Sequence, residues 1–105
     1  MAQTLREAAI NASATGDNTL VAGVASQVIR AFKLFLVVSA ATNLTFKDGG
    51  SALTGAIAMT ANGSITLDLD PRYPWFTTSA GNSLVLGQSG SAQISGRVYY
   101  EQGVP

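Results

Sequence analysis

The stretch Ser64-Ile-Thr-Leu-Asp-Leu-Asp70 carries the fold signal of this chain in its clearest form. Its apolar residues, Ile65, Leu67 and Leu69, alternate strictly with Ser, Thr and Asp. Strict alternation places apolar side chains on one face of an extended strand and polar side chains on the other. The stretch therefore predicts a β-strand with one buried face and one solvated face.

Other stretches extend this pattern along the chain. Residues 43–47 and 92–101 alternate in the same way, whereas residues 28–39 are apolar on both faces. A strand apolar on both faces is typical of the centre of a sheet that is covered twice. The second sheet of a sandwich supplies one cover, and a loop, the N-terminal arm or a neighbouring subunit supplies the other. A helix is the rival interpretation, but the β-branched and aromatic residues favour a strand.

Turn signals separate the strands. Asp48-Gly49-Gly50 and Asn62-Gly63 predict hairpins, because their residues tolerate the positive φ angles of tight turns. Pro71 and Pro74 bracket an irregular crossing that ends the 64–70 strand. We predict about eight strands, over residues 8–14, 18–24, 28–39, 43–48, 52–59, 64–70, 83–88 and 92–101. The predicted fold class is all-β: an antiparallel, jelly-roll-like β-sandwich.

A single β-sandwich domain is predicted over residues 9–101. Residues 1–8 are predicted to form an N-terminal arm and residues 102–105 a C-terminal tail, since neither carries a pattern of its own. The arm has two interpretations: a disordered tail, or a segment that adds to a neighbour's sheet or docks on a scaffold.

The composition argues against an enzyme. The chain has no His and no Cys, so the usual Ser–His–Asp and Cys–His sites and most zinc sites cannot be built. We therefore predict no catalytic residue, no cofactor and no metal ligand. Asp68 and Asp70 lie on one strand face and could form a Ca²⁺ site or a glycosidase pair. The favoured interpretation of this pair is a solvated strand face with Arg72 as a loose partner.

Charge is sparse and balanced. Charged residues make up 11% of the chain, six basic and six acidic, against about 25% in an average soluble domain. The basic residues are scattered and form no stripe, so a nucleic-acid partner is not expected. The longest strongly apolar run, residues 34–38, is too short to span a bilayer, so no membrane partner is expected. A net charge of zero removes long-range repulsion between copies and favours self-association.

The densest aromatic cluster is Arg72-Tyr73-Pro74-Trp75-Phe76, which contains the only tryptophan. Large rigid side chains of this kind anchor protein interfaces or stack on sugars. The alternative is that Trp75 and Phe76 cap one end of the core. The candidate residues for a partner interface are Arg6, Arg72, Tyr73, Trp75, Phe76 and Tyr99.

Three strings carry a resemblance to a known group: Ala14 to Val21 (ATGDNTLV), Leu44 to Gly55 (LTFKDGGSALTG) and Trp75 to Leu84 (WFTTSAGNSL). They resemble small β-rich proteins from the structural gene modules of tailed bacteriophages. The better understood comparison is with capsid decoration, or cement, proteins, which are often β-sandwich or jelly-roll trimers on the head surface.

This resemblance implies a non-enzymatic virion structural protein that stabilises the phage head. Its implied partners are the major capsid protein and other copies of itself, as a homo-oligomer that we expect to be a trimer. Its implied location is the capsid surface, after synthesis in the host cytoplasm. The alternative is a tail or fibre-tip domain that binds host surface glycans through Tyr73 and Trp75.

Overall fold

The computed structural model describes residues 5–70 and 72–105, which form two antiparallel β-sheets of five strands each. The strands in chain order are β1 (Arg6–Ala12), β2 (Gly16–Val21), β3 (Val28–Val38), β4 (Thr42–Asp48), β5 (Ser51–Ala52), β6 (Ile57–Met59), β7 (Ser64–Leu67), β8 (Phe76–Thr77), β9 (Leu84–Gln88) and β10 (Ile94–Gly103). This part of the chain contains no helix, and hence no helix able to cross a membrane. The predicted all-β class is confirmed.

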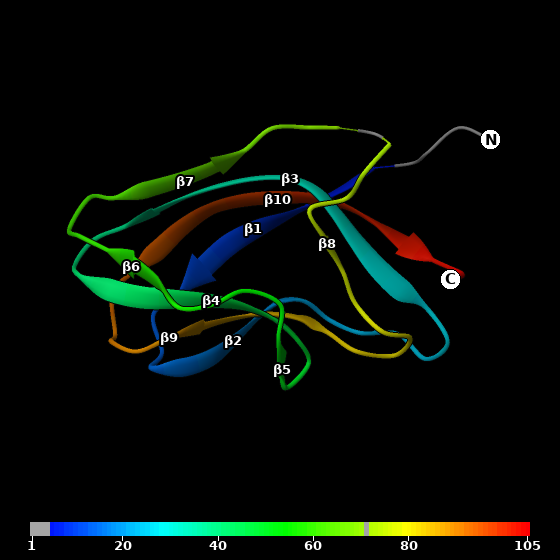
Figure 1. The fold of residues 1–105 in the computed structure, drawn as a ribbon, viewed down its shortest axis with the longest axis horizontal. Coiled ribbons are helices and arrows are strands. Elements are labelled where there is room, and N and C mark those ends of the chain that lie inside the picture. Colours follow the sequence, from blue (N-terminus) through cyan, green and yellow to red (C-terminus); the bar gives the residue numbers. More distant parts are fainter. Residues whose placement is uncertain (1–4, 71) are drawn as a thin grey trace.

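The two sheets occupy the upper and lower halves of the view in Figure 1. Sheet A has the strand order β1-β10-β3-β7, with β8 also paired to β3. Sheet B has the order β2-β9-β4-β5, with β6 also paired to β4. Apolar side chains of both sheets form one core cluster, which includes the fully buried Leu36 and Ile94 of sheet A and Leu44 and Leu86 of sheet B. The arrangement is sandwich-like.

Strand β3 departs from the simple alternation that its sequence suggests. Its pairing with β10 shifts between Tyr99 and Tyr100, which leaves Phe32 without a partner opposite it. A bulge of this kind adds one residue and reverses the alternation beyond it. Ile29 and Ala31 consequently join the core cluster, together with the later even-numbered residues of the strand. Strict alternation along residues 28–39 would place Ile29 and Ala31 on the face opposite to Leu36, and the bulge is the reason that it does not hold.

The outer face of β3 is covered at one end only. Phe32 is 1% exposed, whereas Phe35 and Val37 are 45% and 44% exposed in the single chain. The sequence predicts a second cover for this strand, but the described residues do not bury Phe35 and Val37. A neighbouring subunit as their cover stays a prediction.

The segment predicted as one strand over residues 52–59 is interrupted. Ser51–Ala52 and Ile57–Met59 pair with different ends of β4. Between them, the Thr54 hydroxyl accepts a hydrogen bond from the Phe46 backbone N at 3.2 Å. A side-chain oxygen thus takes the place of a backbone carbonyl, and the strand ladder stops there.

The strands extend into both predicted terminal segments. β1 begins at Arg6, which pairs with Tyr100, and β10 continues to Gly103, which pairs with Val28. Near the end of β10, Glu101 Oε1 forms an ion pair with Arg30 Nη1 of β3 at 3.0 Å. Residues 6–8 and 102–103 therefore belong to sheet A, because backbone pairing needs no apolar pattern. Residues 1–4 of the predicted arm lie outside the described residues.

Candidate protein-contact site

The predicted aromatic cluster lies in the connection between β7 and β8, which follows the upper edge of the view in Figure 1. We call residues 68–70 and 72–75 the 68–75 loop; Pro71 lies outside the described residues. Both flanking strands pair with β3, so the loop leaves and rejoins the same edge of sheet A. The Trp75 indole Nε1 donates to the Asp68 carbonyl at 2.8 Å and closes the loop at its base.

Asp70 organises the interior of the loop. Its Oδ1 accepts hydrogen bonds from the Arg72 backbone N at 3.0 Å and from Arg72 Nε at 3.4 Å. The backbone hydrogen bond from Arg72 is the main cause that holds the pKa of Asp70 below its ordinary value, and the Arg72 guanidinium adds to this effect. The Tyr73 backbone N donates to the Asp70 carbonyl at 3.2 Å, which completes a tight turn.

The loop presents large side chains to solvent. Tyr73 and Trp75 are 69% and 50% exposed, and Leu69 is 46% exposed. The Arg72 guanidinium lies 5.6 Å from the centre of the Tyr73 ring, within the range of a cation–π contact. Hydrogen bonds inside the loop thus hold three large apolar or aromatic groups and an arginine at the surface of sheet A.

The six residues predicted as an interface do not form one cluster. Arg72, Tyr73 and Trp75 share the loop, but Phe76 turns inward and stacks on Phe46 with ring centres 4.6 Å apart. Phe76 follows the alternative interpretation, that part of the aromatic cluster caps the core.

Arg6 and Tyr99 lie elsewhere on sheet A. Arg6 is exposed at the start of β1, and Tyr99 lies in β10 opposite Lys33, whose Nζ is 5.5 Å from the centre of the tyrosine ring. In the order β1-β10-β3-β7, strand β3 separates both residues from β7. They are therefore not part of the loop site.

The carboxylate pair shows no metal-binding arrangement. Asp70 Oδ1 is bonded to Arg72, and Asp68 contributes its backbone carbonyl to Trp75. In residues 5–70 and 72–105, no group of three or more acidic, His or Cys side chains could hold a metal ion. Arg72 is the partner of Asp70, as the sequence predicts, but the predicted shared strand face is wrong, because β7 ends at Leu67 and both carboxylates lie in the 68–75 loop.

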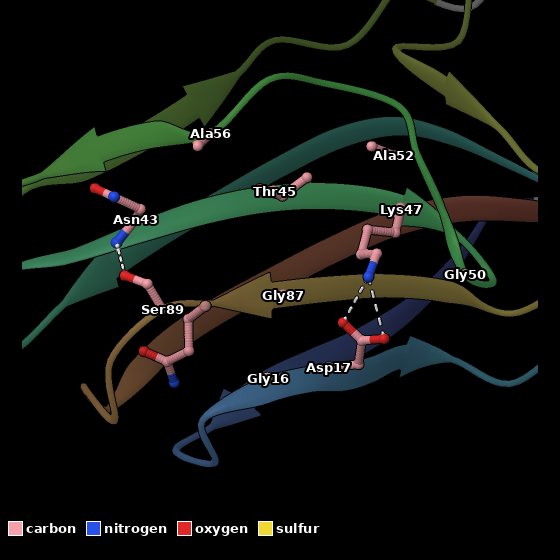
Figure 2. Close-up of a pocket in the computed structure, with 11 residues that line it drawn as sticks. Gly16, Asp17, Asn43, Thr45, Lys47, Gly50, Ala52, Ala56, Gly87 and Ser89 are labelled. Atoms are coloured by element: carbon pink, nitrogen blue, oxygen red, sulfur yellow. Dashed lines mark hydrogen bonds and ion pairs between the residues drawn. The ribbon is translucent and has the colours of Figure 1, made fainter.

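Sheet B carries a groove on its outer face that the sequence did not reveal. It measures about 460 Å³ and lies over β2, β9 and β4, bordered by Ala52 and Ala56. Figure 2 shows Lys47 of β4 reaching across β9 at Gly87 to Asp17 of β2. Lys47 Nζ lies 2.9 and 3.2 Å from the two Asp17 carboxylate oxygens.

Gly87 makes this crossing possible. A Cβ at that position would lie 3.1 Å from Asp17 Oδ1 and 3.5 Å from Lys47 Cδ. Gly87 lies inside β9, within the strand predicted over residues 83–88. The groove contains no aromatic side chain, and its ion pair is solvent-accessible and hence weak. Its polar groups define no particular ligand, so the 68–75 loop is the better candidate site.

Comparisons of this chain with protein-family models, with curated proteins and with solved structures found no match.

A variant that lacks the Trp75 indole hydrogen bond tests whether this bond keeps the 68–75 loop closed. Trp75→Phe keeps an aromatic ring but removes the donor to Asp68, so we expect the loop to open more often. The loss of one hydrogen bond corresponds to a rise of about 2- to 10-fold in the open population. Tryptic cleavage after Arg72 should accelerate by this factor. Cleavage after Lys47 in the same digest should not change, and equal acceleration at both sites would contradict the local role of Trp75.

Proposed function

We propose that this protein is a non-enzymatic virion structural protein: a capsid decoration protein that binds and stabilises a phage head as a homo-oligomer. The observation that carries the proposal is the 68–75 loop, whose internal hydrogen bonds hold exposed Tyr, Trp and Arg side chains in place. Tyr, Trp and Arg are the residues that contribute most to binding energy at protein interfaces. A loop already ordered before contact also loses less conformational entropy on binding.

The outer face of β3 adds a second line of support. Phe35 and Val37 are half exposed on a strand whose composition is typical of one covered on both sides. Contact with another protein copy would remove these side chains from water. The even balance of six basic and six acidic residues places no electrostatic barrier against such contact.

The proposal extends to the fold, which we propose is a jelly roll. When β5 and β6 are treated as one interrupted strand and β8 as an edge addition, two four-stranded sheets remain, β1-β10-β3-β7 and β2-β9-β4-β5. The chain then passes between the sheets repeatedly, as in a double-sheet jelly roll. This architecture is the one that the resemblance to decoration proteins implies.

Capsid binding tests the proposed function directly. The protein should be found by quantitative mass spectrometry in purified virions at a copy number proportional to that of the major capsid protein. It should also co-sediment with capsids that lack it. Tyr73→Ala, which changes an exposed side chain, should weaken this binding at least about tenfold, as expected for an interface anchor.

Leu53→Ala provides the control, because Leu53 is exposed at 38% but lies in the connection between β5 and β6, on the other sheet. Its capsid binding should equal that of the unchanged chain. A protein that is absent from virions and does not bind capsids would overturn the proposal.

A tail or fibre-tip domain that binds host glycans is the second candidate. The exposure of Tyr73 and Trp75 on one loop is the observation that favours it. A glycan array probed with the unchanged chain and with Tyr73→Ala separates the two candidates. Binding that depends on Tyr73 supports the glycan function, and an array without any signal removes it.

A further inference from the structure

Strand β1 is an edge strand with an open side. Within residues 5–70 and 72–105 it pairs with β10 alone, over all seven of its residues. Backbone hydrogen bonds outside the strand ladders involve none of these residues. One side of β1 therefore presents a row of unpaired backbone donors and acceptors, which is a template for pairing with another strand.

The other sheet edges are protected in ways that β1 is not. β2 contains an irregularity between Thr19 and Val21, and the Asn18 side chain donates to carbonyls at its start. β5, β6, β7 and β8 are two to four residues long. Bulges and short lengths are standard protections against edge-to-edge association. β1 has no proline and no bulge, and its only charged residues are its first two, Arg6 and Glu7.

The hydrogen-bonding direction along β1 follows from its neighbours. The Ser39 backbone N donates to the Gln93 carbonyl at 3.0 Å, so Gln93 faces β3. Backbone groups alternate in direction along a strand, so the even-numbered residues of β10 face β1. Their partners on β1 are also even-numbered. The N–H and C=O groups of Glu7, Ala9 and Asn11 therefore point to the open edge.

A second copy of β1 can pair over all seven residues of the strand in one register, which is centred on Ala9. If two β1 strands pair antiparallel about a two-fold axis at Ala9, each Glu7 lies opposite Asn11 of the second copy, and Arg6 lies opposite Ala12. All three outward-facing residues then form hydrogen-bonded pairs, each with two backbone bonds. No like charges come opposite each other, whereas a register centred on Glu7 would oppose two carboxylates.

Side chains complete the match. Asn11 Oδ1 accepts a hydrogen bond from Gln93 Nε2 at 2.7 Å, which leaves the Asn11 amide N–H groups as donors. In the register centred on Ala9, this amide faces the Glu7 carboxylate of the second copy, which also accepts hydrogen bonds from Arg97 of its own chain at 3.2 and 3.3 Å. The small side chain of Ala9 lets the two edges approach at the axis.

We propose that the open edge of β1 is a self-association surface of this protein, on which the β1 strand of a second copy docks antiparallel to join two A sheets into one. The inference rests on one part of the proposed function, namely that copies of this protein associate with each other. It adds that they do so through β1 and about a two-fold axis. The contact is isologous and closes on itself as a dimer. A trimer, which the resemblance implies, requires a heterologous contact between two different surfaces.

Charge variants at the axis test the contact. Ala9 is exposed, and a two-fold axis brings the two Ala9 residues together, so Ala9→Lys and Ala9→Glu each place like charges opposite each other. The unchanged chain should form dimers of twice 10.8 kDa in sedimentation and native mass spectrometry. Each variant alone should associate at least about tenfold more weakly, and an equimolar mixture should restore a mixed dimer. Ala58→Lys, an exposed alanine in β6, should dimerise like the unchanged chain.

A backbone variant gives an independent measurement. The Ala9 N–H points to the open edge, so Ala9→Pro removes a donor of the dimer and none of the β1–β10 ladder. This variant should be monomeric while its circular dichroism spectrum remains that of a β protein. The inference is overturned by a chain that stays monomeric up to about 1 mM, by a trimer, or by a dimer that is insensitive to all three Ala9 variants. It is also overturned if Ala58→Lys abolishes the dimer equally.

A separate measurement, capsid binding by the Ala9 variants, tests the proposed function. A monomeric Ala9 variant retains Tyr73 and Trp75, so its co-sedimentation with capsids still reports on the decoration function. If the unchanged chain binds capsids but forms no β1 dimer, the edge contact alone is refuted. If it forms the β1 dimer but does not bind capsids, the decoration function alone is refuted.

Discussion

Gly96→Ala is expected to cost about 3 kcal/mol of the free energy of unfolding, which is the upper end of the usual cost of overpacking a tightly packed site. Gly96 lies in β10, paired with Ile10 on one side and with Leu36 on the other. A Cβ at Gly96 would collide with the Phe35 carbonyl oxygen and would lie 2.8 Å from the Leu36 Cα. These are backbone atoms of the central strand, so relief requires the two strands to move apart.

Thermal unfolding followed by circular dichroism measures this cost. For a domain of this size, about 3 kcal/mol corresponds to a fall of more than about 10 °C in Tm. Gly50→Ala and Gly55→Ala are matched controls, because a Cβ at either position meets no atom within 4 Å. Both should change Tm by only a few degrees. A Gly96→Ala protein with the Tm of these controls would contradict the close approach of β10 and β3.

Gln88→Leu is expected to destabilise the protein by about 3 kcal/mol, because it leaves several polar groups without partners. Gln88 is 4% exposed. Its Oε1 accepts from the Thr42 hydroxyl at 3.1 Å and from the Ala92 backbone N at 3.0 Å. Its Nε2 donates to the carbonyls of Ala14 at 3.2 Å and Ala92 at 3.0 Å. One side chain thus joins β4, the β1–β2 turn and the β9–β10 turn.

The matched control is Gln93→Leu, the same change at an exposed glutamine in the neighbouring turn. Urea unfolding should show a loss below about 1 kcal/mol for Gln93→Leu, since water can replace its hydrogen bonds. The two variants should have similar m-values, as expected when the unfolded surface is the same. Equal midpoints for the two variants would show that the Gln88 network adds no stability.

The sequence predicts the strands well where one face is buried and the other is wet. The alternation from Ser64 to Leu67 is β7, and the strand then ends three residues before the predicted end at Asp70. It ends because Asp68 and Asp70 make hydrogen bonds within the loop. The Asp68 carbonyl accepts a hydrogen bond from the Trp75 indole, and the Asp70 carboxylate accepts one from the Arg72 backbone N. Alternation of apolar and polar residues carries no information about these hydrogen bonds, so the predicted strand over residues 64–70 is longer than β7.

The remaining differences come from contacts distant in sequence. The extra residue at Phe32 becomes visible only when β3 is paired with β10. The first residues of β1 are polar and lack a pattern, and their pairing with β10 draws on the opposite end of the chain. The sequence predicts Gly87 within a strand, but only the Lys47–Asp17 ion pair that crosses over it explains why a glycine stands there. The sequence shows the aromatic cluster, but it does not show that Tyr73 is exposed while Phe76 packs inward, because that depends on the stacking of Phe76 on Phe46.

The pairing of β1 with β10 also has a consequence for synthesis on the ribosome. Among the described strands, β1 is made first, yet its strand partner in sheet A is β10, which is made after all the others. Contacts this distant in sequence slow folding, because a long loop must close before they form. Sheet A therefore cannot be completed until β10 has left the ribosome. A nascent chain that stops before Ile94 carries β1 without its partner, and its unpaired backbone is then exposed on both sides to other chains.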